Sequence, residues 1–140
     1  MDKIINHQFW RTHALLIARI FMGALFVYSG FMKLNGGIED TAMYIESAGI
    51  PAATLLAWAA AIIELVAGAM LILGYYFKEA ALTLAVFVFI ISFPFHGPAT
   101  WEVDPMQQTA FLKNMAIVAG LLFMAAHGAG QTWSLKLKSF

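Results

Sequence analysis

Apolar residues form four continuous blocks along the chain, and each block is interrupted by very few charged positions. The blocks cover about residues 14–33, 54–77, 80–96 and 109–127. Each is near the length of about 20 residues that a helix needs to cross the hydrocarbon core of a bilayer. Lipid admits only helices or closed barrels, and these runs lack the alternation of barrel strands. The pattern predicts an all-α fold, an integral membrane bundle of four antiparallel helices in a single domain over residues 1–140.

The composition agrees with a bilayer as the solvent. Apolar residues make up 61% of the 140 positions and charged residues 11%, against about 45–50% and about 25% in a typical soluble domain. A domain of this size could not hide so much apolar surface from water. Eight basic and eight acidic residues cancel, and no basic stretch could follow a phosphate backbone, so nucleic-acid binding is excluded. The absence of cysteine excludes disulfides, iron–sulfur clusters and thiol redox chemistry.

Basic residues outside the blocks fall mainly on one side of the predicted spans. Lys3 and Arg11 precede the first span, Lys78 lies between the second and third, and Lys136 and Lys138 follow the fourth. The opposite connections are loops that we expect to be solvated, and they are acidic: Glu39, Asp40, Glu46, Glu102 and Asp104. The positive-inside rule then predicts a multi-pass protein of the inner (plasma) membrane, with its N- and C-termini in the cytoplasm.

Each predicted span gathers its small and polar residues on one helical face, at spacings of three and four. We interpret the glycines and alanines on these faces as packing positions that let helices approach closely. An ionisable residue at the bilayer centre costs about 2.5–3.5 kcal/mol on insertion scales, which makes it a functional candidate. The ligand-binding or polar-core candidates are Arg19, Lys33, Glu64, His96, Lys113 and Asn114. No metal site is predicted, and catalytic residues remain unknown.

Glu64 is the most informative candidate because it lies near the middle of the second span. At 1.5 Å per residue, Arg19 lies about 7 Å to the cytoplasmic side of the membrane centre and Lys113 about 7 Å to the outer side. Side chains lean toward the N-terminus of their own helix, which favours a Glu64–Lys113 pair over Glu64–Arg19. We expect Glu64, Lys113 and Asn114 to form one buried cluster, with Arg19 below it or reaching the cytoplasmic headgroups. A purely structural ion pair is the alternative.

Three histidines lie at the ends of predicted spans. His96 ends the third span beside Pro94, which breaks or kinks a helix, and lies at a depth similar to Lys33. A break at membrane depth is tolerated where it lines a cavity, so we expect a pocket wall at His96. His13 and His127 share one depth and could ligate a b-type haem. Boundary histidines are commonly interfacial and no other haem signal is present, so haem is not predicted.

Short motifs follow one another in a definite order over about residues 14–130. They are Ala18-Arg19, Ser29-Gly30-Phe31-Met32-Lys33-Leu34, Tyr44-Ile45, Gly49-Ile50-Pro51, Glu64-Leu65-Val66-Ala67-Gly68, Phe95-His96 and Leu112-Lys113-Asn114. In this order they resemble the DoxX family of small four-helix membrane proteins. The family pattern tends to have paired glycines where this sequence has Ala67-Gly68, a departure that should affect packing only.

The resemblance implies a link to quinones. The family name is associated with the membrane subunit of a thiosulfate:quinone oxidoreductase, and other members are linked to quinone handling or to membrane-bound redox-defence complexes. The family is also similar in architecture to the vitamin K epoxide reductase bundle, whose chemistry needs cysteines that this chain lacks. The leading hypothesis is a membrane subunit of an oxidoreductase system that binds a quinone or another lipophilic redox molecule. Its proposed contacts are Lys33, His96 and Lys113 to a carbonyl, Glu64 as a proton relay, and Phe26 and Phe89 around the ring.

Two other function classes stay open. One is a non-catalytic anchor or assembly subunit, whose polar core only fixes the bundle. The other is a small anion carrier, in which Arg19, Lys33 and Lys113 outnumber Glu64; the narrow bundle and the lack of an inverted repeat argue against it. The expected partner is the lipid bilayer, with a second copy or a redox partner subunit left open. The chain carries no evident redox centre, so electrons would come from a partner or a second substrate.

Overall fold

The computed structural model describes residues 2–130, 134 and 135, and gives only the backbone for residues 2–8, 11 and 12. Every regular element in this part of the chain is helical. The elements are α1 (Asp2–Met32), a π-helical turn (Lys33–Gly37), α2 (Ile38–Ser47), α3 (Ala53–Leu73), α4 (Phe77–His96), a 3-10 turn (Pro98–Thr100) and α5 (Met106–His127). Four helical stretches of the described residues are long and apolar enough to cross a membrane: His13–Ser47, Ala53–Leu73, Phe77–Thr100 and Met106–His127. The predicted all-α membrane fold is confirmed.

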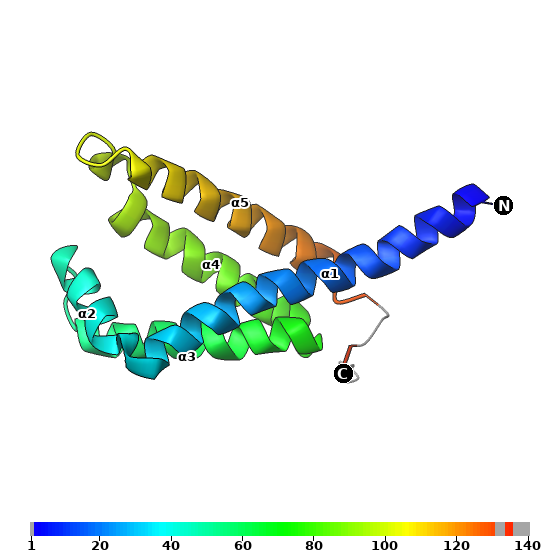
Figure 1. Cartoon of the computed structure of the whole chain (residues 1–140), viewed down its shortest axis with the longest axis horizontal. Coiled ribbons are helices and arrows are strands. Elements are labelled where there is room, and N and C mark those ends of the chain that lie inside the picture. Colours follow the sequence, from blue (N-terminus) through cyan, green and yellow to red (C-terminus); the bar gives the residue numbers. More distant parts are fainter. Residues whose placement is uncertain (1, 131–133, 136–140) are drawn as a thin grey trace.

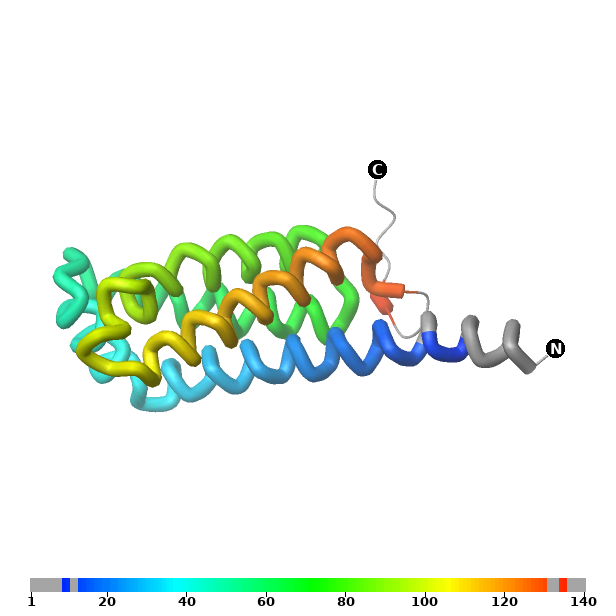
Figure 2. Tube along the Cα trace, turned by 90° about the horizontal axis from the view of Figure 1, so that it is seen from above, coloured from blue at the N-terminus to red at the C-terminus, as the bar shows by residue number. Residues whose placement is uncertain are grey.

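The four long helices lie along the long axis of the molecule, and each runs antiparallel to the next (Figure 1). The main contacts join α1 to α3 and α4 to α5, and a smaller α3–α4 contact connects the two pairs. Figure 2 shows α4 and α5 side by side, with the α4–α5 connection at the same end of the bundle as α2. Helix α5 packs on α4. Side chains of α5 can therefore contact α3 only at positions where α4 does not lie between the two helices.

Glycines set the ends of two spans. Gly74 has a φ of 69° and donates its N–H to the carbonyls of Leu71 and Met70, which closes α3 as a left-handed cap. At the end of α1 the chain turns through Asn35 and Gly36, and the φ of 98° at Gly36 suits glycine alone. Only Gly74 to Tyr76 separate α3 from α4, as expected for an antiparallel hairpin.

Helix α2 departs from the sequence interpretation. The connection that carries Glu39, Asp40 and Glu46 was expected to be a solvated loop, but it is a ten-residue helix that packs on α3. Ile45 faces inward and is buried, whereas the three carboxylates are exposed. The acidic side chains Glu39 and Asp40 lie in the first turn of α2, where they complement the helix dipole.

The buried core lies between the helix pairs. It is apolar and contains Phe26, Leu71, Leu84, Leu121 and Met124 together with several alanines. Alanine and glycine let the helices approach closely where large side chains would hold them apart. The core therefore fixes α1 against α3 and leaves the polar side chains of these helices in defined positions.

The N-terminal half of α1 and the end of α5 lie at the same end of the bundle (Figure 1). The predicted cytoplasmic placement of this end depends on five basic residues, of which Lys78 is exposed in the first turn of α4. The side chains of Lys3 and Arg11, and all of Lys136 and Lys138, lie outside the described residues. The orientation stays a prediction.

Candidate functional site

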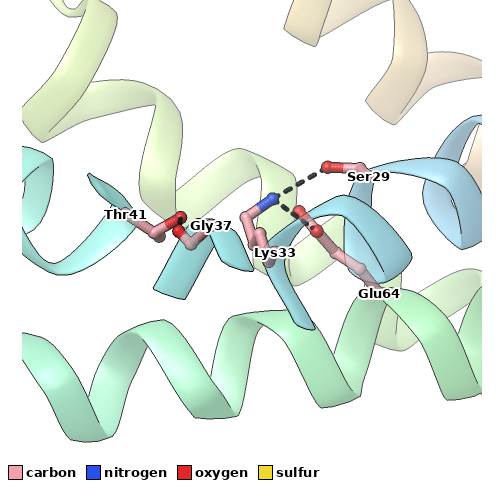
Figure 3. A network of polar contacts seen from close by, with 5 residues as sticks. All are labelled: Ser29, Lys33, Gly37, Thr41 and Glu64. Atoms are coloured by element: carbon pink, nitrogen blue, oxygen red, sulfur yellow. Dashed lines mark hydrogen bonds and ion pairs between the residues drawn. The ribbon is translucent and has the colours of Figure 1, made fainter. Parts of the chain in front are cut away.

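An ion pair joins the π-helical turn that follows α1 to the middle of α3. Lys33 Nζ lies 2.7 Å from Glu64 Oε2 and also donates to Ser29 Oγ at 2.8 Å (Figure 3). The Glu64 side chain is 8% exposed and the Lys33 side chain 21%. Ser29 precedes Lys33 by one helical turn, so the two side chains lie on one face of α1. Glu64 is therefore held by a cation within the bundle, as a buried carboxylate requires.

The predicted partner of Glu64 was wrong. Lys113 is exposed, and Asn114 donates from Nδ2 to Ser92 Oγ at 3.1 Å instead of joining a cluster with Glu64. The reason is helix order, because α5 packs against α4 and so Asn114 meets a side chain of α4. Ser92 in turn donates to the carbonyl of Val88 at 2.6 Å. This contact links α4 to α5 and is separate from the ion pair.

Lys33 directly follows α1, where the first span was expected to end. The sequence put it at a depth similar to His96, at the end of its span, but α2 lies beyond the end of α1 at that end of the bundle (Figure 1). The turn that starts at Lys33 is fastened to α2, since Thr41 Oγ1 donates to the carbonyl of Gly37 at 2.7 Å (Figure 3). Lys33 therefore lies inside the bundle, beside the middle of α3.

Arg19 has a different role from the one expected. Arg19 is buried, with 1% of the residue exposed, and its guanidinium donates from Nη1 to the carbonyl of Ala129 at 2.8 Å. The expectation that it snorkels to the headgroups is wrong, because the chain after α5 folds back over it. Nearby, the N–H of Leu135 donates to the carbonyl of Leu73 at 2.9 Å. Arg19 thus connects α1 to the segment that follows α5.

A cavity of about 660 Å³ lies between α2, α3 and α4, next to the ion pair. Its polar lining includes Lys33, Glu64 and His96, and the rest is mainly apolar. Two lining residues, Leu56 at 40% and Ile90 at 61%, are also exposed on spans that cross the membrane. The cavity therefore opens beside these residues, toward lipid.

Helix α2 forms the roof of the cavity. Tyr44 of α2 stacks on Phe95 of α4, with ring centroids 4.9 Å apart and planes inclined by 20°. Both rings line the cavity, as do Asp40 and Thr41 of α2. These α2 residues were not among the predicted site residues, because the segment was interpreted as a solvated loop. The turn signal Asn35-Gly36-Gly37 followed by acidic residues is the pattern of a helix start that could have revealed it.

His96 lies in the cavity wall, at the end of α4. The helix continues past Pro94 to His96, and both residues line the cavity. Nδ1 of His96 is hydrogen-bonded to Oε1 of Gln107, and Trp101 donates from Nε1 to the His96 carbonyl at 2.8 Å. Gln107 was not among the predicted site residues, because nothing in the sequence shows that the first turn of α5 approaches the end of α4.

The other predicted aromatic and histidine positions lie elsewhere. Phe26 is part of the buried core, and Phe89 lies at the outer surface against Phe93, so neither of the two residues lines the cavity. His13 and His127 each bond through Nδ1 to a carbonyl of their own helix, Phe9 at 2.9 Å and Phe123 at 2.8 Å. Each histidine ring also stacks on that same phenylalanine.

Comparison with known proteins identifies the family. The model of the DoxX family matches residues 14–97, which run from Ala14 of α1 to the end of α4 and therefore include the ion pair and the cavity. The chain belongs to the DoxX family. No solved structure matches it.

Two relatives from Escherichia coli (strain K12) support this assignment of the DoxX chain. It is 31% identical over 116 residues to the inner membrane protein YqjF, an alignment that covers 83% of this chain and 85% of the relative. It is also 31% identical over 126 residues to the inner membrane protein YphA, covering 86% of each. With four helices that can span a membrane, this DoxX protein is a multi-pass protein of the inner membrane.

Proposed function

We propose that this DoxX protein binds a quinone, or a lipophilic redox molecule of similar size, in the cavity between α2, α3 and α4. In this function it serves as the membrane subunit of an oxidoreductase system. The cavity of about 660 Å³ carries the proposal, because small-molecule sites are mostly apolar hollows of about 300–1,000 Å³ with a few polar groups. The exposed lining residues Leu56 and Ile90 support entry of the ligand from the lipid.

Lys33 is the group that would bind a ligand oxygen. An ammonium has three N–H donors, and two of them are used by Ser29 and Glu64. The third is available to a carbonyl or hydroxyl oxygen in the cavity that Lys33 lines. Glu64 keeps the ammonium in position and is the carboxylate through which a proton could reach the ligand.

Aromatic residues of the lining would contact the ring of the ligand. Tyr44, Phe87 and Phe95 all line the cavity, and they take the role that the sequence suggested for Phe26 and Phe89. Aromatic rings favour offset or edge contacts with one another, which suits a flat quinone ring. Because the chain has no evident redox centre, electrons would be supplied by a partner subunit or a second substrate.

Filling the cavity tests the proposal. The full chain in lipid nanodiscs is titrated with a decyl-substituted benzoquinone, and saturable binding is expected. Ala60→Phe places a ring in the cavity that Ala60 lines, so the ring and the ligand compete for the same volume. A cost of about 1–3 kcal/mol should weaken binding by about fivefold to more than a hundredfold. Ala119→Phe, on the exposed face of α5, is the matched control and should bind as the wild type does.

The anchor hypothesis makes the opposite prediction. If the polar core only fixes the bundle, the benzoquinone partitions into the lipid of every sample equally, and no saturable component is found. Binding that survives Ala60→Phe unchanged would also contradict the proposal, because the ligand would then lie outside this cavity.

A further inference from the structure

A chain of hydrogen bonds runs from the α4–α5 connection to the cavity wall. Gln107, in the first turn of α5, donates from Nε2 to Asp104 Oδ2 at 2.8 Å. Its other amide atom, Oε1, lies 2.5 Å from Nδ1 of His96. Asp104 Oδ1 accepts the backbone N–H of Met106 at 3.0 Å, so both oxygens of this carboxylate are engaged. The three side chains therefore form one ordered series.

The direction of each bond in this series follows from chemistry. An ionised carboxylate can only accept, so the amide of Gln107 must turn its NH₂ group toward Asp104. Its oxygen then faces His96 and can only accept, so Nδ1 of His96 must carry the proton. A neutral imidazole has one donor and one acceptor nitrogen, which leaves Nε2 of His96 as an acceptor.

This assignment divides the polar groups of the cavity into two kinds. Lys33 can only donate. The groups of the lining that can only accept are Nε2 of His96 and two carboxylates, Glu64, which Lys33 already engages, and Asp40, which is exposed. A quinone presents two carbonyl oxygens, so one of them would accept from Lys33 while the other met a lone pair at His96. A hydroquinone presents two hydroxyl groups, and each hydroxyl can both donate and accept. Lys33 and His96 can then be satisfied together.

We propose that the cavity selects ligands that carry a hydroxyl group, and so the reduced, hydroquinone form over the quinone, with His96 as the residue that determines this specificity. The inference rests on the proposed function, because it concerns the ligand of the same cavity. It also revises the expectation that His96 donates to a carbonyl. Trp101 supports the geometry by donating to the His96 carbonyl, which fixes the backbone at the end of α4.

Three probes with one carbon skeleton test the selection. A decyl-substituted hydroquinone, its benzoquinone and its dimethyl ether are titrated anaerobically against the full chain in nanodiscs at pH 8, above the ordinary pKa of histidine. The ether keeps both oxygens as acceptors but has no hydroxyl proton. We expect the hydroquinone to bind about tenfold more tightly than either of the other two, the gain of one satisfied hydrogen bond.

Two substitutions locate the cause. His96→Phe keeps a ring in the wall but removes the acceptor, so the three affinities should become equal. Asp104→Asn removes the carboxylate that fixes the amide of Gln107, so His96 is free to take either tautomer and the tenfold ratio should fall. Glu102→Gln removes an exposed carboxylate from the same connection and is the matched control, which should keep the ratio. A purely structural role of His96 would change all three affinities by the same factor and leave their ratio intact.

The outcomes separate the two proposals. Equal affinity of the three probes for the wild-type chain, with all three still weakened by Ala60→Phe, overturns the hydroxyl selection and leaves the cavity as the binding site. A tenfold preference that persists in His96→Phe also overturns it. If none of the probes binds in a manner that Ala60→Phe weakens, the proposed function itself fails.

Discussion

Glu64→Leu is expected to destabilise the protein by about 3 kcal/mol or more, because it leaves the ammonium of Lys33 without its carboxylate inside the bundle. Lys33 Nζ lies 2.7 Å from Glu64 Oε2, and both side chains are largely hidden from the surface. The double variant Lys33→Met/Glu64→Leu should recover most of the loss, since apolar side chains of similar volume often replace a buried ion pair without cost. The measurement is the free energy of unfolding in mixed micelles, followed by circular dichroism.

Lys113→Met provides the control for this cycle. Lys113 also lies on a membrane-spanning helix, but it is exposed, so its loss should change the free energy of unfolding by no more than about 0.5 kcal/mol. The ion pair would lose its assigned role in stability if Lys113→Met cost as much as Glu64→Leu. The same conclusion would follow if the double variant were no more stable than Glu64→Leu alone.

The membrane spans could be predicted because they depend on local composition. Apolar blocks of about 20 residues have one stable solution in lipid, although the second span was expected to reach residue 77 and ends at Leu73, where Gly74 caps it. Helix α2 was missed although a local start signal, Asn35-Gly36-Gly37 followed by acidic residues, precedes it. It is short and carries three exposed carboxylates, and its packing on α3, with Ile45 buried, cannot be read from the sequence.

The partner of Glu64 could not be predicted from depth alone. Depth arithmetic compares positions along parallel axes, but it contains nothing about which helices are neighbours. Lys113 and Arg19 were weighed at similar distances from the membrane centre, whereas Lys33 was not considered as a partner. The packing of α1 on α3 and of α5 on α4 brings Lys33 to Glu64 and keeps Lys113 away from it. The candidate residues were well chosen where burial forces a polar group inward, as for Glu64. They failed for Lys113, which lies on the exposed side of α5.

For His96, too, the sequence indicated the position of the residue but not its neighbours. Its position beside Pro94 indicated a pocket wall, and both residues do line the cavity. Its hydrogen-bonding character depends on Gln107 and Asp104, which approach it only because the α4–α5 connection folds back. The position of His96 in a pocket wall could be inferred from the sequence, but its hydrogen-bond partners could be identified only from the three-dimensional contacts.

The α1–α3 interface leaves no room for a side chain at its glycines. A Cβ added at Gly30 would lie 2.6 Å from the backbone nitrogen of Leu65 and 2.8 Å from the carbonyl oxygen of Ala61. At Gly68 it would lie 2.9 Å from the carbonyl oxygen of Gly23 and from the backbone nitrogen of Val27. These neighbours are backbone atoms of the facing helix, so only separation of α1 from α3 can relieve the contact.

Gly30→Ala and Gly68→Ala are therefore expected to destabilise the protein by about 1–3 kcal/mol, even though alanine favours a helix over glycine by about 1 kcal/mol. Gly120→Ala is the matched control, because its Cβ would meet only the end of the flexible Met22 side chain at 3.2 Å, and it should be neutral or stabilising. Gly30 precedes Lys33 by one turn of α1, so Gly30→Ala should also displace the ammonium from Glu64 and weaken benzoquinone binding. Unfolding and binding measured on the three variants decide the matter: equal stability of Gly30→Ala and Gly120→Ala would mean that α1 and α3 do not approach through these glycines.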